Sequence, residues 1–231
     1  MTGMTINLTK SKLHRKQPLR DQIYDLVRDL ILSGSIKPGE VIDEKLIALQ
    51  LNISRTPVRE AVKKLSDEHL VDVVAQSGTR AAKIDRHEVE QAFLIRRALE
   101  TESAAQAAPR MTDTHTDNLS DILLQHARAI ERKLYKEAIA HDDHFHRYIA
   151  EISDLPRLWK SVEISKAHLD RCRHLMLPRA GEGVSTIEHH REIIRALNSK
   201  NPERARAAMS EHLETAYDNA TKALDAGEIE T

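Results

Sequence analysis

Apolar residues recur at helical spacing through most of this 231-residue chain, and the segment 70–84 is the clearest departure from that pattern. This segment is rich in β-branched residues and is interrupted by "SGT", which predicts a short hairpin. Aromatic residues make up only 3% of the chain, and glycine and proline lie mostly between the periodic segments. The chain is therefore expected to be mainly helical rather than a β-sandwich or barrel.

Three helices are expected before the hairpin. The first runs from about Pro18 to Ser33, and the second covers 43–51 with an aspartate as its candidate N-cap. The third begins at Thr56, an N-cap followed by Pro57 at the first helical position, or alternatively at Ser54. Three helices followed by a hairpin are the pattern of a winged helix-turn-helix.

After the hairpin, the periodicity predicts helices only. Prolines and glycines fall at the breaks, and Asn201 followed by Pro202 is a favourable N-cap and first helical position. The predicted helices run from Asp85 or His87 to about Ala108 and then cover 114–133, 135–152, 156–177, 185–199 and 202–225. This part of the chain is expected to form an all-α bundle.

The chain is expected to have three parts: a mobile basic tail over 1–17, a winged helix-turn-helix domain over 18–84 and a helical domain over 85–231. Residues 1–85 carry 14 Lys and Arg against 11 Asp and Glu, although the whole chain has a net charge of −1. This local excess suits a nucleic-acid partner, or it belongs to a tail that has no partner. Charge alone leaves both interpretations open.

Several classes of protein are disfavoured. The single cysteine, Cys172, excludes a disulfide framework within the chain. No apolar run approaches the roughly 20 residues of a membrane span, and the N-terminus lacks the apolar core of a secretory signal. We expect a cytoplasmic protein without a membrane partner.

The predicted third helix divides into an inner and an outer face. Apolar side chains can pack inward, which leaves four polar side chains outside: Arg55, Thr56, Arg59 and Lys63. A recognition helix needs this division, because one face anchors the helix while long donors enter the major groove. The alternative is an ordinary helical pair with a solvated, charged face.

The amino-acid sequence of the predicted winged helix-turn-helix resembles the DNA-binding domain of the GntR family of bacterial transcription regulators. The resemblance rests on "IKPGE", "RTPVREA" and "QSGT" and covers roughly residues 18–84. It implies binding to double-stranded operator DNA, with contacts from Lys45, Arg55, Arg59 and Gly78. The chain departs from the family where Asn52 replaces a usual glycine and Ala75 a frequent proline; asparagine tolerates the left-handed turn expected there.

Ionisable residues also occur on helix faces that should be buried. On the helix 135–152, Asp142 and His146 fall within the apolar stripe, one turn apart, and two later stripes include His190 and His212. Three other histidines fall outside these stripes: His141, His144 and His189. One carboxylate and three imidazoles facing one core predict a site for a divalent ion, such as Zn, Ni, Mn or Fe. The alternatives are core histidines bonded to carbonyl groups, or a metal-free pocket that binds an anion directly.

A second resemblance covers roughly residues 88–225. The patterns "RRALE", "DDHFH", "HREIIRAL" and "ARAAMSEHL" look like the FCD effector domain of the FadR subfamily. In metal-binding members of that family, the positions of Asp142, His146, His190 and His212 hold a divalent ion. The ion helps to bind a small organic or sugar acid. Arg96 matches an arginine near the effector in relatives, or else pairs with Glu100 on the helix surface. Further candidates for the pocket are Arg171, Arg173 and His174.

These observations predict a ligand-responsive transcription regulator, expected to be a repressor, that binds operator DNA as a homodimer. The main rival is a metal-dependent enzyme on a helical scaffold. Four protein ligands leave a less open ion than the three that are usual in catalytic zinc sites, and no general base is evident. A third interpretation is a DNA-binding protein in which the metal only stabilises the fold.

Overall fold

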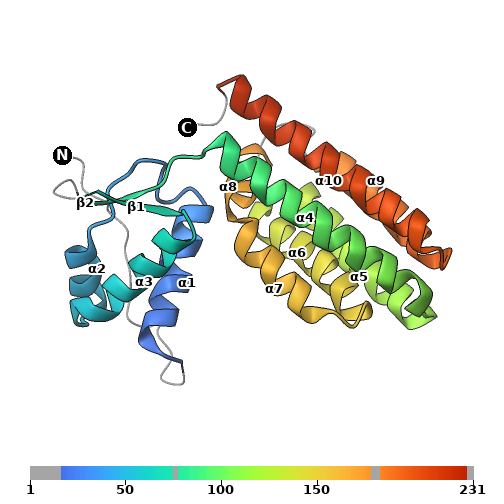
Figure 1. Cartoon of the computed structure of the whole chain (residues 1–231), viewed down its shortest axis with the longest axis horizontal. Helices are drawn as coiled ribbons and strands as arrows, with labels where there is room; N and C mark the ends of the chain where they lie inside the picture. The colour runs from blue at the N-terminus through green and yellow to red at the C-terminus, as the bar shows by residue number, and fades with distance from the viewer. Residues whose placement is uncertain (1–16, 75–77, 178–182, 228–231) are drawn as a thin grey trace. The chain divides into compact units, whose positions relative to one another are not determined.

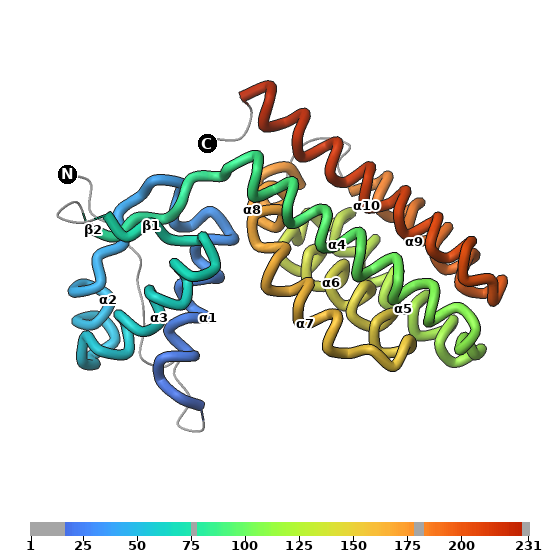
Figure 2. Tube along the Cα trace, viewed as in Figure 1, coloured from blue at the N-terminus to red at the C-terminus, as the bar shows by residue number. Residues whose placement is uncertain are grey.

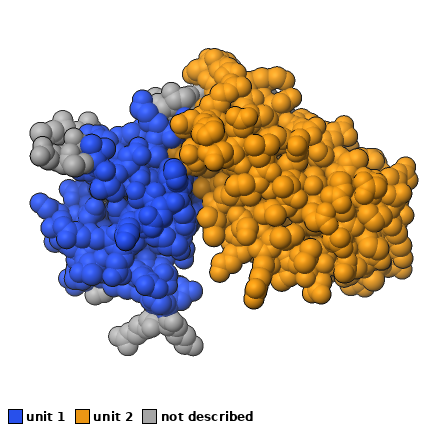
Figure 3. Space-filling view, viewed as in Figure 1, with its two compact units in different colours: residues 1–84, 230–231 blue, residues 85–229 orange. Residues whose placement is uncertain are grey.

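The computed structural model describes residues 17–74, 78–177 and 183–227, so Ala75 and all but the last residue of the expected tail lie outside the described residues. The chain divides between Ile84 and Asp85 into two compact units, which Figure 3 colours separately. None of the helices in the described segments is long and apolar enough to cross a membrane.

The first unit contains three helices and a two-stranded antiparallel sheet (Figure 1). The elements are α1 (Leu19–Leu32), α2 (Glu44–Leu51), α3 (Arg55–Asp67), β1 (Val71–Val74) and β2 (Gly78–Ala81). The strands pair in register, with Val71 opposite Ala81 and Val74 opposite Gly78. This is the winged helix-turn-helix that the sequence predicted.

The core of the first unit is formed by the apolar stripes of its helices. α3 packs on α1 and α2, and Val58 and Leu65 of α3 are fully buried, as are Ile23 and Val27 of α1 and Ile47 of α2. The α2–α3 turn is closed by Asn52, whose φ of 50° lies in the left-handed region. Asparagine adopts this conformation at a modest cost, so the replacement of the family's usual glycine leaves the turn intact.

The predicted start of α3 at Thr56 is wrong, and the alternative start at Ser54 is confirmed. Ser54 has an extended backbone (φ −71°, ψ 162°) and occupies the N-cap position, so Arg55 is the first helical residue. Pro57 is then the third helical residue rather than the first. Its missing N–H is still harmless there, because the first four N–H groups of a helix have no partner within it.

The described residues of the second unit form seven α-helices and a short 3₁₀ helix. They are α4 (Arg86–Ala107), η2 (Ala108–Arg110), α5 (Asp113–Glu131), α6 (Tyr135–Ile152), α7 (Pro156–Ser165), α8 (Ala167–Met176), α9 (Val184–Asn198) and α10 (Pro202–Asp225). α4 and α10 pack side by side along most of their length (Figure 2), α5 packs on α6 and α9, and α7 packs on α4. As predicted, the side chain of Asn201 caps α10 and Pro202 is its first residue.

The sequence predicted one helix over 156–177, but the structure divides it into α7 and α8 at Lys166. This residue has a ψ of −1°, which interrupts the regular helix, and its side chain turns inward. Its Nζ atom donates to Asp143 at 2.8 Å and to Asp170 at 2.5 Å. The break is therefore associated with a buried ion cluster that periodicity could not reveal.

Candidate functional site

The predicted DNA-contacting side chains gather around one hollow of the first unit. Lys45 from α2, the α3 residues Arg55, Arg59 and Lys63, and Gly78 from the hairpin line this hollow of about 930 Å³. All of these residues are exposed. Thr56 is exposed as well, but it is not among the described residues that line the hollow.

The chemistry of this surface suits a nucleic acid. Arginine side chains can bond bidentately to guanine in the major groove, and lysine side chains can bind phosphates. Arg55 and Arg59 lie in the first half of α3 and Lys63 in its second half, and Lys45 lies in the first turn of α2. Long donors along one face of a helix are what a helix that enters a groove requires.

One acidic residue beside this surface was missed by the sequence analysis. Glu44, the first residue of α2, accepts a hydrogen bond of 2.8 Å from the hydroxyl group of Thr79 on β2. Its other carboxylate oxygen lies 3.7 Å from Nε of Arg59. Glu44 therefore connects the hairpin to the exposed face of α3 and restrains the guanidinium group of Arg59.

The second unit brings together the four predicted metal ligands. Asp142 and His146 come from α6, His190 from α9 and His212 from α10, and each is at most 4% exposed. The ligand atoms of the three histidines lie within 4.8 Å of one another. Nε2 of His190 lies 3.5 Å from Oδ1 of Asp142. The three histidines predicted to lie outside this group are only partly buried: His141, His144 and His189.

A fourth buried histidine belongs to the same cluster. His126 on α5 is 3% exposed and forms a second group with Asp142 and His190, again with ligand atoms within 4.8 Å of one another. This histidine was not among the ligands predicted from the sequence. His126 follows Leu119, Ile122 and Leu123 at helical spacing, so the periodicity that identified the other histidines also places this one inward.

The hydrogen bonding of the cluster is incomplete in a way that suits a cation. His190 is fully buried, yet neither of its ring nitrogens has a hydrogen-bond partner among the described residues. Its ring stacks on Phe145 with centroids 4.1 Å apart, which fixes its orientation. The Nε2 atoms of His146 and His212 lie 3.2 Å apart. Buried lone pairs without a donor are costly, and a divalent ion would satisfy them.

The protonation states also fit an ion. Burial holds the pKa of His190 well below the usual value, and the neighbouring His212 lowers it further. Burial and the neighbouring His146 likewise hold the pKa of His212 well below the usual value. Burial raises the pKa of Asp142, but Arg173 and the neighbouring histidines together outweigh it, so this pKa lies well below its usual value. Neutral imidazoles and an ionised carboxylate are the forms that bind metal ions.

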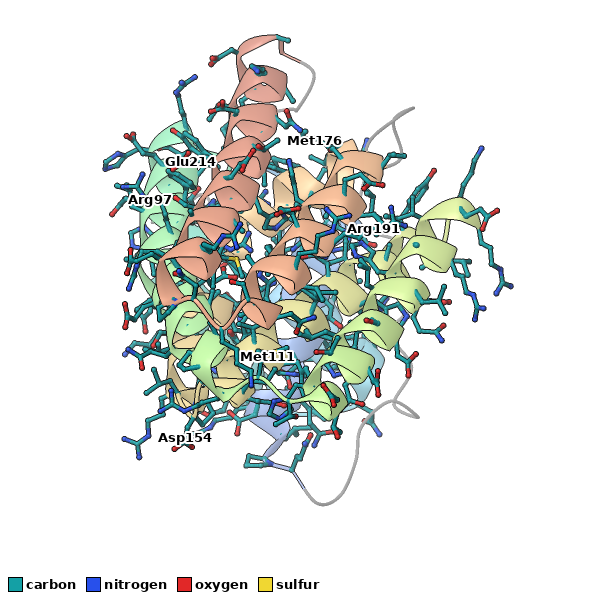
Figure 4. All side chains as sticks on the ribbon, turned by 90° about the vertical axis from the view of Figure 1, so that its right-hand side faces the viewer. Arg97, Met111, Asp154, Met176, Arg191 and Glu214 are labelled. Carbon is teal, nitrogen blue, oxygen red and sulfur yellow. The ribbon has the colours of Figure 1, made fainter. Side chains whose placement is uncertain are left out.

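Arg96 and Glu100 form a buried pair rather than the surface pair considered from the sequence. Arg96 Nε donates to Glu100 Oε1 at 2.6 Å, and both side chains are 5% exposed. By contrast, the next arginine along the chain, Arg97, makes a half-exposed pair with Glu214 at 3.5 Å, and both of these residues are labelled in Figure 4. Burial raises the pKa of Glu100, but Arg96 and then His146 outweigh it and hold this pKa below the usual range.

A cavity of about 90 Å³ adjoins the cluster. Its charged and polar lining includes Arg96, Asp142, Arg173 and His212, and its apolar lining includes Ile139, Leu169 and Met176. Of the predicted effector residues, Arg96 and Arg173 line the cavity. Arg171 is buried, and neither it nor His174 is among the described residues of the lining. The cavity thus combines two guanidinium groups with an apolar wall, an arrangement that suits a small acid.

The comparisons with known proteins agree with both units. Residues 19–80 match the family described as bacterial regulatory proteins, gntR family, and residues 91–215 match the FCD domain. The chain is 32% identical over 205 residues to the HTH-type transcriptional repressor RspR of Escherichia coli, covering 89% of this chain and 90% of that protein. It is 24% identical to the transcriptional regulator McbR of the same species over 82% of this chain and 87% of the relative.

A solved structure confirms the fold. The structure of E. coli McbR/YncC covers 90% of this chain and 99% of its own with a TM-score of 0.77 at 22% identity. The two family matches together cover most of each compact unit. The chain belongs to the GntR family of bacterial transcription regulators and joins that family's DNA-binding winged helix-turn-helix to an FCD domain.

Proposed function

We propose that this regulator is a homodimeric repressor that binds a two-fold operator and responds to a small organic or sugar acid. In this proposal Asp142, His146, His190 and His212 hold a divalent ion, and the acid binds in the adjoining cavity. The repressor role is supported by the name of the E. coli relative. Dimerisation is expected because a single winged domain reads little sequence, and paired half-sites add affinity and specificity.

The observation that carries the metal site is the unsatisfied state of His190. A fully buried imidazole without a hydrogen-bond partner is unfavourable unless a ligand completes its environment. Three further ligand-type side chains converge on it from α6 and α10. A bound divalent ion would supply positive charge for the carboxylate of the acid.

The binding of the acid is supported by the residues around the cavity. Arg96 and Arg173 are planar donors suited to carboxylates, and the cavity is also lined by apolar side chains. Arg96 is fixed by Glu100, so it presents a preorganised charge. The acid can alter operator affinity only if it binds differently to two arrangements of the dimer. We propose that the placement of the two DNA-binding domains differs between these arrangements.

The test is operator binding measured by fluorescence anisotropy, with a duplex selected from random sequences. Organic and sugar acids are added to the zinc-loaded and to the chelated protein. We expect at least one acid to weaken operator binding, and only in the zinc-loaded protein. Stabilisation by zinc without an effect of any acid would indicate a purely structural ion. An equal response after chelation would indicate a metal-free anion pocket, and consumption of the acid would indicate an enzyme.

A further inference from the structure

Arg173 connects the predicted metal ligand Asp142 to a separate ion cluster. Its Nη2 atom donates to Oδ2 of Asp142 at 2.6 Å, a shorter hydrogen bond than those that its Nη1 atom makes to Asp170 and Asp143. Its Nη1 atom donates to Oδ1 of Asp170 at 3.0 Å and to Oδ1 of Asp143 at 3.2 Å. The two nitrogens thus serve two different sets of carboxylates.

The second set is satisfied without Asp142. Asp143 and Asp170 are each held by Arg173 through one oxygen and by Lys166 through the other, which closes a ring of four charged side chains. Lys166 and Asp170 are almost completely buried. The ring therefore anchors Arg173 through Nη1 whatever happens at its Nη2 atom.

We propose that Arg173 is the internal counter-ion of Asp142, and that ligation of a divalent ion by Asp142 frees the Nη2 edge of Arg173 for the carboxylate of the effector. This inference rests on the proposed function. Asp142 is 4% exposed, so its charge needs a cation at all times, and Arg173 supplies it in the absence of an ion. Arg173 also lines the cavity, where an acid can reach the freed edge.

This exchange has a thermodynamic consequence. In the absence of an ion, Arg173 holds Oδ2 of Asp142, which lies 3.9 Å from Nε2 of His146, so it competes for a carboxylate oxygen that faces the ligand cluster. Its charge also repels a second cation. In the absence of an ion, Arg173 is also unavailable to an acid, because its accessible edge is occupied by Asp142. Metal and acid should therefore bind cooperatively, and each should raise the affinity for the other by the same factor.

The direction of the effect separates this proposal from an ordinary supporting role. If Arg173 only held Asp142 in position for the ion, its removal would weaken metal binding. If it competes with the ion, its removal strengthens metal binding. The two roles predict opposite signs for the same substitution.

The experiment is calorimetric titration of the full chain with Zn²⁺ in the presence of a competing chelator, with and without acetate. Arg173→Gln should bind Zn²⁺ about tenfold more tightly than the native protein, a typical size for coupling between sites, and acetate should no longer tighten it. Arg195→Gln is the matched control, because Arg195 is an exposed arginine of α9 paired with Glu192. It should behave like the native protein. Unchanged or weaker Zn²⁺ binding by Arg173→Gln would overturn the proposal.

Two further measurements apply if Arg173→Gln does not fold. Arg173→Lys keeps a charge for the ring but lacks a second planar edge, so it should fold and lose the effect of acetate. In the native protein, acetate should tighten Zn²⁺ binding, and no such coupling would also overturn the proposal. A native protein that binds no Zn²⁺ would instead refute the proposed metal site itself, so the two failures are distinguishable.

Discussion

Nδ1 of His146 lies 2.6 Å from Oε2 of Glu100, a carboxylate on the neighbouring helix α4. A carboxylate at this nitrogen favours the tautomer that carries its proton on Nδ1, which leaves the Nε2 lone pair for an ion. Glu100 is in turn held by Arg96, which lines the cavity. One chain of contacts thus links the predicted metal ligand to a predicted effector residue.

Glu100→Gln should therefore weaken metal binding. Partners of this kind orient the ligand and raise its basicity, so we expect a loss of about 10- to 100-fold in Zn²⁺ affinity. Glu102→Gln, on the exposed side of the same helix, is the control and should leave the affinity unchanged. Equal affinities in chelator competition would mean that the Glu100 contact does not support the site.

The assignment of α3 as the recognition helix predicts a loss of operator binding. Arg55→Ala and Arg59→Ala should each cost ~1–3 kcal/mol if the lost contact is a base edge. Arg195→Ala, an exposed arginine of the second unit, should have no such effect. Anisotropy with the selected operator measures all three, and unchanged affinity in both α3 variants would contradict the assignment.

Glu44 should affect sequence discrimination more than general affinity for DNA. Glu44→Gln keeps an acceptor for Thr79 but removes the charge that restrains Arg59. Because Arg59 is exposed and Glu44 is only partly buried, we expect the ratio of specific to non-specific affinity to fall by only about two- to fivefold. Affinity for an unrelated duplex should stay the same or rise, and an equal loss on both duplexes would indicate a general structural defect.

The sequence was informative wherever an element depended on local pattern. Asp142 and His146 were placed in a buried stripe by spacing alone, and the structure buries both. Asparagine at position 52 was expected to tolerate a left-handed turn and does so. Periodicity determines which face of a helix is buried, so residues on that face could be grouped before their partners were known.

What periodicity did not reveal were contacts between distant segments. The break at Lys166 depends on Asp143, which lies on another helix, and the restraint of Arg59 depends on Glu44. The pairing of Arg173 with Asp142 joins α8 to α6 in the same way. Such pairs are created by tertiary packing, and a single sequence contains no local trace of them.

Acid should destabilise the metal-free second unit. Burial keeps the pKa values of His190 and His212 well below the value of about 6.5 that histidine has in the unfolded chain. The unfolded state therefore binds more protons between the two values. The stabilisation is fully present above about pH 6.5 and is lost as the pH falls toward the folded values.

The single tryptophan, Trp159, is buried in the second unit and reports its unfolding by urea in the chelated protein. The midpoint should fall as the pH is lowered from 7.5 to 5.5, an interval chosen around the usual histidine pKa of about 6.5. His190→Gln should reduce this dependence, whereas His141→Gln, which changes a partly exposed histidine, should not. A midpoint that rises with acidity would contradict the neutral state of the buried histidines.

Elemental analysis of purified single variants, after dialysis against a weak chelator, tests the metal site itself. We expect one divalent ion per native chain and a loss of the ion when Asp142, His146, His190 or His212 is replaced by alanine. Alanine at His141, His144 or His189 should leave the metal content unchanged. A native protein without a divalent ion, or a His144→Ala variant that loses the ion while His146→Ala keeps it, would rule out this site.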